Sequence, residues 1–452
     1  MLRLPRMFLW SVIGCIALVG VALPYVRFAH GRWYADHRPA MLTILVSVFL
    51  IWTLGRPFLV LVSDRMRRPV PPGTKTGVSI IVPCHDAADR LPNLVARLLA
   101  QTYRPLEIVL VENNSTDDTW GVLLDLAGDH PEVKIHAVDT DPAEYPASVA
   151  INIGIATASY DVILRMDDDT YLRRDAVANG LAELQAARAV AIACDLRVAN
   201  PTASVWTRLQ SMEYLLAMDV DRRSQALLDS VLCCSGAMSM FRKDVILRAG
   251  GFVSAPPVVS EDMDMTLKAH RFGRVAMAPE CIGFTDVPES LVRLTHQRFR
   301  WAISGTVSLY LHRGGIANVG YWHNPLVGFV GLPLRLVSSL RDLLAPVFIL
   351  DICLLLMYDG PIWFAILFGV RALVMLIELL LLVPALNRVE VKQGLSNWWL
   401  IPSFVLAFGP FLLLVRFLGS WAGVIHISRL RHRGDVVYQR GLSLRHLATV
   451  PG

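Results

Sequence analysis

Three consecutive carboxylates, Asp167, Asp168 and Asp169, have the residue types and spacing best suited to chemistry. They directly follow the apolar run 161–166, whose length and composition predict a buried strand. Adjacent acids repel one another and gain little in a packed core, so a divalent cation is an economical reason for keeping them together. The pattern therefore indicates a metal-held diphosphate at the carboxyl end of a strand. A solvated turn after the strand explains the same residues equally well.

Polar side chains also follow two other predicted strands. The segment 83–86 (PCHD) follows the apolar strand 78–82, and the segment 112–115 (ENNS) follows the strand 106–111. The carboxyl ends of strands in an open α/β sheet converge on one crevice, so we expect all three polar segments to line a single ligand site. The sequence has neither G-x-G-x-x-G nor G-x-x-x-x-G-K-[ST] at these strand ends, which argues against a dinucleotide fold and a P-loop.

The elements that must position these residues alternate along the chain. Short apolar strands are separated by helical stretches at 91–101 and 118–127, and a further strand is predicted at 133–138. Such alternation predicts a parallel α/β sheet, and continuously apolar strands indicate that both faces of the sheet are covered.

Two downstream segments could add chemistry to the same crevice. Glu261 and Asp262 stand at the start of a helical stretch, 263–271; a helix cap explains Glu261, but explains Asp262 less easily. Helical spacing sets Gln297, Arg300 and Trp301 on one face of a later helix. In isolation that face is typical of an interfacial helix with a tryptophan anchor.

Composition predicts an integral membrane protein. The chain has 452 residues, of which 54% are hydrophobic, and its longest apolar runs approach or exceed the roughly 20 residues that span a bilayer. These runs are 7–26, 41–62, 343–357, 361–384 and 398–427. The last run is interrupted at Gly409-Pro410 and is too long for one upright helix; either it forms a bent hairpin, or the basic tail is an exception to the positive-inside tendency.

The expected domain layout follows from these runs. We predict an N-terminal transmembrane helix pair at 1–68, a cytosolic domain at 69–312, interfacial helices at 313–342, C-terminal transmembrane helices at 343–428 and a basic tail at 429–452. Basic residues after the second run place the soluble domain in the cytosol. A net charge of +5 without a basic run rich in aromatic residues argues against nucleic-acid binding. Seven cysteines without a C-x-x-C pair fit a reducing compartment and argue against a zinc site.

Taken together and in order, the motifs resemble those of the membrane-embedded family 2 glycosyltransferases, the group of cellulose, chitin and hyaluronan synthases. The resemblance covers roughly 78–301: the family's D-x-D is similar to 167–169, its T-E-D to 260–262 and its Q-x-x-R-W to 297–301. The family's V-P-x-[YN]-N-E segment is similar to 82–86. The resemblance implies a GT-A fold, which is α/β and Rossmann-like with a mostly parallel sheet, inserted between transmembrane helices.

Two departures from the family pattern stand out. The family's acidic pair after the second strand is here Glu112 and Asn113; an Asn carbonyl can still accept a hydrogen bond from a base N3–H, so uracil is allowed. The lysine that often precedes the family's A-L-N is absent from 147–152. Arg165 or Arg298 could supply the missing positive charge at the phosphates.

The resemblance also implies roles for individual residues. Asp262 is the expected general base, Glu261 and Trp301 the expected acceptor contacts, and Asp169 with Asp167 the expected ligands of Mg²⁺ or Mn²⁺. Asp168 is expected to point away. The expected nucleotide-sugar contacts are Pro83, His85, Asp86, Glu112, Asn113, Asp167, Gln297 and Arg300.

The implied activity is that of an inverting glycosyltransferase that moves a sugar from a nucleotide-diphosphate sugar, foremost a UDP-sugar, to a growing polysaccharide, processively and with export. The first alternative is non-processive transfer to a lipid acceptor. A second alternative, from another class, is a non-catalytic transporter or scaffold with a degenerate domain. The expected location is the bacterial plasma membrane, in contact with lipid, with an export partner or a second copy of the chain as further candidate partners.

Overall fold

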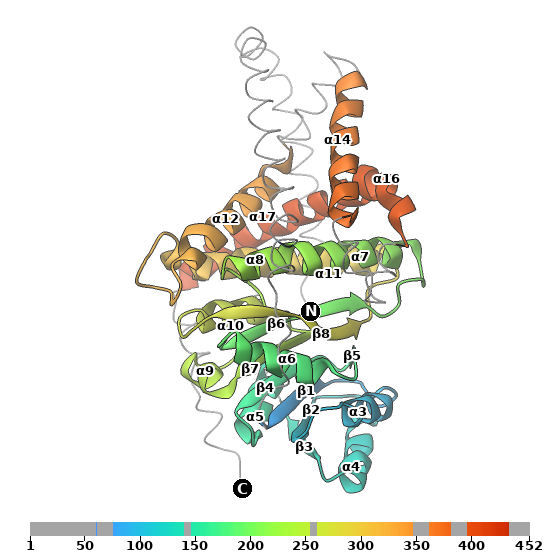
Figure 1. Cartoon of the computed structure of the whole chain (residues 1–452), viewed down its shortest axis with the longest axis vertical. Coiled ribbons are helices and arrows are strands. Elements are labelled where there is room, and N and C mark those ends of the chain that lie inside the picture. Colours follow the sequence, from blue (N-terminus) through green and yellow to red (C-terminus); the bar gives the residue numbers. More distant parts are fainter. Residues whose placement is uncertain are drawn as a thin grey trace.

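An eight-stranded sheet forms the centre of the part of the chain that the structure describes (Figure 1). The computed structural model describes residue 60 and residues 76–139, 146–253, 260–346, 361–380 and 396–433. The strand order is β3-β2-β1-β4-β7-β6-β8-β5. The strands are β1 (Val78–Cys84), β2 (Leu106–Asn113), β3 (Val133–Val138), β4 (Val162–Met166), β5 (Thr170–Leu172), β6 (Ala191–Val198), β7 (Met238–Arg242) and β8 (Val275–Thr285).

The first half of the sheet is parallel, as the alternation of strands and helices predicts. β1 pairs in parallel with β2 and with β4, and β2 pairs in parallel with β3. Ile80, Ile108 and Ile163 are fully buried, because these strands are covered on both faces. The covering helices are α3 (Leu91–Leu99), α4 (Thr119–Asp129), α5 (Pro146–Thr157) and α6 (Ala176–Ala186).

The second half of the sheet is mixed, so the expectation of a mostly parallel sheet holds only for the first half. β7 runs antiparallel to both β4 and β6, β5 runs antiparallel to β8, and β6 and β8 are parallel. The antiparallel pairing of β4 with β7 sets Met166 opposite Met238. The segment before β7 therefore lies at the carboxyl end of β4, and the Asp167 N–H donates to the Ala237 carbonyl at 3.2 Å.

A layer of helices lies over the second half of the sheet in Figure 1. It contains α7 (Val205–Leu216), the π-helix η1 (Ala217–Arg222), α8 (Arg223–Leu227) and α11 (Leu291–Leu311). Helix α7 begins at a capping box formed by Ser204 and Thr207, which satisfies amides of its first turn. Two shorter helices, α9 (Lys243–Arg248) and α10 (Glu261–Ala269), follow β7.

Further helices pack on the outer side of α11. They are η2 (Arg313–Gly315), η3 (Val327–Gly331), α12 (Leu332–Leu343), α14 (Pro361–Leu380), η5 (Trp398–Leu400), α16 (Ile401–Ser403), η6 (Phe404–Phe408) and α17 (Gly409–Arg433). A Cβ on Gly419 of α17 would lie 2.6 Å from the Ala302 Cβ of α11, so the missing side chain permits close helix packing. Phe299 and Ile303 of α11 share one buried cluster with Leu418 of α17.

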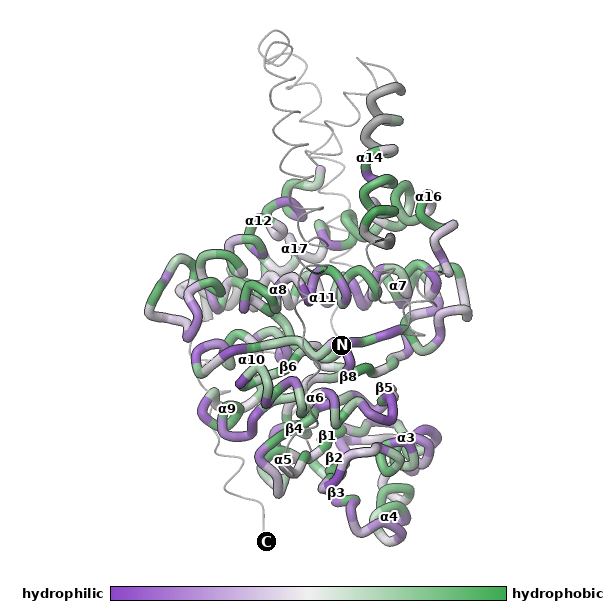
Figure 2. The backbone as a smooth tube through the Cα atoms, in the orientation of Figure 1, coloured by the Kyte–Doolittle hydropathy of each residue, from purple (hydrophilic) through white to green (hydrophobic). Residues whose placement is uncertain are grey.

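The apolar C-terminal run is helical throughout its described part. Within the described residues, the stretch Trp398–Ser428 is the one helix long and apolar enough to cross a membrane by length and composition. The π-turn η6 directly precedes Gly409-Pro410, the point where the sequence predicts an interruption, because Pro410 has no N–H to continue an α-helical ladder. Figure 2 shows hydrophobic residues concentrated along α16 and the described turns of α14.

Several predicted membrane segments lie partly or wholly outside the described residues. The run 7–26 and all of 41–62 except residue 60 lie outside the described residues, as do 347–357, 381–384 and the tail beyond 433. The described part of the run 361–384 is the helix α14. The predicted boundaries at 68, 312, 342 and 428 stay predictions.

Candidate functional site

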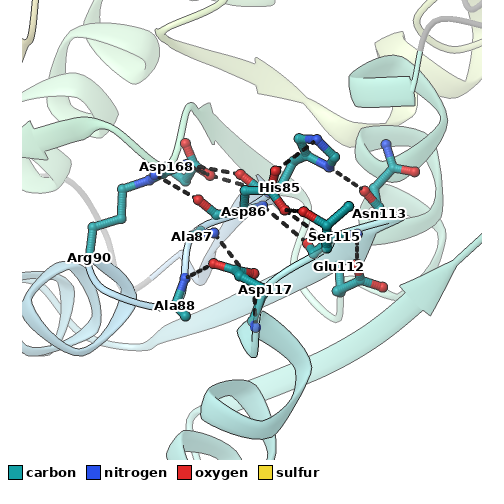
Figure 3. A network of polar contacts seen from close by, with 12 residues as sticks. His85, Asp86, Ala87, Ala88, Arg90, Glu112, Asn113, Ser115, Asp117 and Asp168 are labelled. Atoms are coloured by element: carbon teal, nitrogen blue, oxygen red, sulfur yellow. Dashed lines mark hydrogen bonds and ion pairs between the residues drawn. The ribbon is translucent and has the colours of Figure 1, made fainter.

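The loops that follow β1, β2 and β4 meet at one edge of the sheet, as the strand-end motifs predict. In the parallel register Cys84 of β1 lies opposite Glu112 of β2, and Ile81 of β1 lies opposite Arg165 of β4. The polar residues that follow these strands therefore gather in one network, which Figure 3 shows from close by.

Direct hydrogen bonds join the loop after β1 to the loop after β2. The His85 ring Nδ1 lies 2.8 Å from the Asn113 carbonyl oxygen, and the Thr116 amide donates to Asp86 Oδ1 at 2.6 Å. Hydrogen bonds from Thr116 are the main reason that the pKa of Asp86 lies below its ordinary value. Asp86 adopts a positive φ of 46°, a strained conformation held by these bonds.

The predicted nucleotide contacts of β1 and β2 line the base of this network. Glu112 Oε1 accepts from the Ser115 amide at 2.6 Å, which shapes the loop after β2. Asn113 is buried at the last position of β2, and Pro83 is half-buried in β1. The structure thus brings Pro83, His85, Asp86, Glu112 and Asn113 together, while their contacts with a nucleotide stay predictions.

Arg90, which the sequence motifs do not single out, links this network to the acid turn. Its guanidinium donates to the carbonyl oxygens of His85 and Asp86, at 3.0 Å each, and to Asp168 Oδ2 at 2.8 Å. The His85 amide donates to the same carboxylate oxygen at 3.4 Å. Asp168 therefore turns toward the loop after β1, and the expectation that it points away from the site is wrong.

Asp167 and Asp169 flank that carboxylate in a strongly acidic environment. Burial, with repulsion from neighbouring acids that include Asp169 and Asp262, raises the pKa of Asp167 to about 6. Removal from water and the charge of Asp168 raise the pKa of Asp169. A cation at this turn would relieve this repulsion.

The donor chemistry of the acid turn suits a hard divalent cation. Among the described residues, no group of three or more His, Cys, Asp or Glu side chains is arranged to hold a metal ion. Asp167 and Asp169 are two oxygen donors, and Mg²⁺ is normally held by one or two carboxylates together with water and substrate phosphates. The residues present thus fit such an ion as part of its ligand shell.

Asp262 lies on the opposite side of the acid turn, in the first turn of α10. Its Oδ2 accepts from the Gly236 amide at 3.0 Å, and its Oδ1 accepts from the Ser260 hydroxyl at 2.5 Å and from the Met263 amide at 2.7 Å. The segment before β7 therefore fixes this carboxylate. The Asp167 amide donates to the Ala237 carbonyl, next to Gly236, so both acids contact the same short segment.

Glu261 forms a buried ion pair beneath the site. Its Oε1 accepts from Arg165 Nη2 at 2.7 Å, and the side chains are 13% and 2% exposed, respectively. The Arg165 guanidinium carbon lies 4.9 Å from the centre of the Phe252 ring. Burial raises the pKa of Glu261, against the opposing effect of Arg165. Glu261 thus has a structural partner, and its contact with an acceptor stays a prediction.

Neither arginine suggested as a substitute for the missing lysine is available to a phosphate in this arrangement. Arg165 is held by Glu261, and the buried Arg298 donates to Glu213 Oε2 of α7 at 2.8 Å. Both interpretations are therefore wrong for this conformation, because each guanidinium is buried against a carboxylate from another element. Arg90 instead donates to Asp168 of the acid turn.

Helix α11 carries Gln297, Arg300 and Trp301, and it contacts the residue that precedes α10. The Ser308 hydroxyl of α11 accepts from the Ser260 amide at 3.1 Å, and helical spacing puts Gln297 and Trp301 on the same side as Ser308. Trp301 is 43% exposed, and the Arg298 guanidinium carbon lies 4.2 Å from its ring centre. Arg300 is exposed, and its contact with a diphosphate stays a prediction.

The residues from 79 to 248 match the sequence profile described as glycosyl transferase family 2. This segment is similar to the family 2 glycosyltransferases. The match supports the prediction of a glycosyltransferase, and it includes the loops after β1, β2 and β4. The motifs at 260–262 and 297–301 lie beyond the matched residues.

Curated relatives of this domain act on amino sugars by name. An N-acetylglucosaminyltransferase of Mesorhizobium japonicum is 29% identical over 238 residues, which are 50% of this chain and 55% of that protein. A poly-β-1,6-N-acetyl-D-glucosamine synthase of Staphylococcus aureus is 27% identical over 231 residues, which are 51% of this chain and 54% of the synthase. The chain thus spans about half the length of the curated relatives it matches.

Two solved structures are similar to this chain at lower sequence identity. The mannosyltransferase PcManGT from Pyrobaculum calidifontis, in complex with GDP-Man and Mn²⁺, has a TM-score of 0.48 and 17% identity, covering 78% of this chain and 97% of that one. Residues 1–349 of S. aureus TarS, in complex with UDP-GlcNAc, have a TM-score of 0.41 and 14% identity, covering 72% and 90%. Likenesses at this level assign neither a substrate nor a metal to this chain.

Proposed function

We propose that this chain is an inverting glycosyltransferase that moves N-acetylglucosamine from its UDP-sugar to a growing polysaccharide. The observation that carries the proposal is the convergence of the loops after β1 and β2, the acid turn and Asp262 at one edge of the sheet. The names of the curated relatives support the sugar and the polymeric product. Asn113 in place of an acid is compatible with uracil through its carbonyl oxygen.

In the proposed reaction, Asp262 accepts the proton of the acceptor hydroxyl. The hydroxyl oxygen then bonds to the anomeric carbon of the donor sugar, the bond from that carbon to the diphosphate breaks, and the nucleoside diphosphate leaves with the electron pair. Attack on the face opposite the leaving group inverts the anomeric centre.

The hydrogen bonds of Asp262 suit this role. A carboxylate offers about four lone-pair positions, and the Gly236, Ser260 and Met263 donors use three of them. These donors fix the orientation of the carboxylate, and the Cys233 thiol also contacts it. Preorganisation of this kind lowers the cost of reaching the reactive geometry.

Charge on the leaving diphosphate needs compensation. Asp169 and Asp167 would hold Mg²⁺ or Mn²⁺, which acts as a Lewis acid on phosphate oxygens. Asp167 is also proposed to contact the ribose. Arg300 and Gln297 of α11 are proposed to contact the diphosphate once the nucleotide occupies the crevice, and Trp301 to stack on the acceptor sugar.

We also propose that the enzyme works at the bacterial plasma membrane with its catalytic domain in the cytosol. Helix α12 supports this placement, because Leu336, Val337 and Leu340 are exposed on a helix that also carries Arg335 and Arg341. Exposed apolar residues beside arginines suit the lipid headgroup region. The helices of 343–428 would then carry the polymer outward as it grows.

The experiment that tests this function uses the full-length protein in lipid nanodiscs with a panel of radiolabelled nucleotide sugars and Mg²⁺ or Mn²⁺. We expect incorporation from UDP-N-acetylglucosamine into a long product that a sizing column excludes. A single sugar on a lipid would support the non-processive alternative. Absence of transfer and hydrolysis with every donor, under conditions where the protein is folded, would favour a non-catalytic protein.

A further inference from the structure

We propose that Arg90 and Asp168 form a clasp that fixes the nucleotide-contacting loop 83–88 onto the acid turn before substrate binds. The proposal rests on the proposed function and assigns a positioning role to two residues that the motifs leave without one. The clasp joins residues 78 positions apart in the chain.

The contacts converge on one carboxylate oxygen. Asp168 Oδ2 accepts from Arg90 Nη2 at 2.8 Å and from the His85 amide at 3.4 Å. The same guanidinium reaches the carbonyl oxygens of His85 and Asp86. Arg90 thus binds the loop main chain and the acid turn together, which the planar fork of an arginine permits and a lysine does not.

Electrostatics gives a reason for this arrangement. Three adjacent carboxylates repel one another, and the middle one projects toward the loop rather than toward its two neighbours. Arg90 offsets the charge of Asp168. The charges of Asp168 and Asp169 both raise the pKa of Arg90. Asp167 and Asp169 are thereby left as the pair of oxygen donors for the cation.

The Arg90–Asp168 ion pair lies at the binding site and contributes little to the stability of the core. The side chains of Arg90 and Asp168 are 36% and 15% exposed, and ion pairs near the surface contribute little to stability in typical measurements. Its loss should therefore change the register of two binding elements with little effect on global unfolding. Asp86, held at a positive φ in the same loop, would lose part of the support for that conformation.

The test compares Asp168→Asn, Arg90→Lys and Arg90→Gln with wild type in the full-length protein. UDP binding is measured by calorimetry without metal and then with Mn²⁺, alongside the melting temperature and the KM and kcat for the UDP-sugar. We expect about ten-fold weaker UDP binding without metal for Asp168→Asn and Arg90→Gln, which corresponds to the loss of one charge-assisted contact. KM should rise more than kcat falls, and the melting temperature should stay close to wild type.

Two further variants complete the design. Arg97→Gln is the matched control, because Arg97 lies in α3, the helix that follows Arg90, and contacts Asn93 and the Tyr171 ring rather than loop 83–88 or an acid of the turn. The double variant Arg90→Gln/Asp168→Asn should bind UDP no worse than either single variant, since both substitutions break one contact. Arg90→Lys should recover only part of the affinity.

Two results would overturn the clasp. One is UDP affinity within two-fold of wild type in both Asp168→Asn and Arg90→Gln. The other is a loss of Mn²⁺ binding in Asp168→Asn as complete as in Asp169→Asn, which would make Asp168 a metal ligand instead. If wild type itself binds no nucleotide, the proposed function fails, and that outcome is distinct from unchanged variants of a wild type that does bind.

Discussion

Replacing Glu261 with Gln should destabilise the catalytic domain, because it leaves the charge of Arg165 buried without its carboxylate. Arg165 is 2% exposed, and its Nε and Nη1 have no hydrogen-bond partner among the described residues. Removing one partner of a buried ion pair costs about 3–5 kcal/mol. The amide oxygen of Gln can keep one hydrogen bond, worth about 1 kcal/mol. A net loss of about 2–4 kcal/mol follows from these two magnitudes.

The assay is thermal unfolding of the full-length protein, followed by tryptophan fluorescence. For a domain of this size, a loss of about 3 kcal/mol lowers the melting temperature by roughly 6–12 °C. The matched control is Glu280→Gln, because Glu280 pairs with Arg173 at 3.2 Å but is 44% exposed. That control should shift the melting temperature by about 2 °C or less.

A second variant tests the electrostatic cause. The apolar pair Arg165→Met/Glu261→Leu removes both buried charges and should recover part of the lost stability, since a packed apolar pair avoids the desolvation penalty. The reasoning is refuted if Glu261→Gln melts within 2 °C of wild type, or if the apolar pair is less stable than Glu261→Gln.

Three other predictions follow from single contacts. His270 is buried with its pKa lowered to about 4, so unfolding binds a proton between pH 4 and 6.5; acid should cost up to about 3 kcal/mol across that window, and urea unfolding of His270→Gln should show a flatter pH dependence. Gly419→Val should clash with Ala302 and reduce transfer by separating α17 from α11, while UDP binding persists in calorimetry. Trp301→Ala should shorten the product on a sizing column more than it weakens UDP binding, because the exposed ring of Trp301 is the proposed acceptor platform.

The local pattern predicts the parallel half of the sheet and the gathering of its polar strand ends. Predicted strands at 78–82, 106–111 and 133–138 agree with β1, β2 and β3 to within two residues at each end. Continuous apolar runs carry this information for β1 and β2, which are buried along nearly their whole length, whereas β3 is mostly half-buried. The same runs place Asp86, Glu112 and the acid turn at one edge.

Long-range pairing accounts for what the sequence does not predict. The antiparallel β7 depends on a partner more than 70 residues earlier, and nothing local distinguishes it from a parallel strand. Arg90 likewise stands in the sequence as an ordinary residue before a helix, and its role depends on Asp168 from another loop. Three adjacent carboxylates with a single arginine, Arg165, close to them in sequence are the signal that could have prompted a search for a further cation.

Buried arginines show the same limit. The lysine missing from the family pattern prompts the suggestion that Arg165 or Arg298 binds phosphate, but each faces a carboxylate from a distant element, Glu261 and Glu213. A sequence pattern can give the face of a helix or strand on which a residue lies; it cannot give the partner across that face. Burial favours pairing for such a charge, and only the fold supplies the pair.

We propose that Asp262 removes the proton of the acceptor hydroxyl, at a site formed with the residues that follow β1, β2 and β4. The most direct test of this proposal measures UDP affinity and sugar transfer on the same preparations of wild type and Asp262→Asn. We predict that Asp262→Asn binds UDP within about three-fold of wild type and loses transfer by at least about a hundred-fold, the usual contribution of a general base. Transfer by Asp262→Asn at a rate close to wild type would contradict the account.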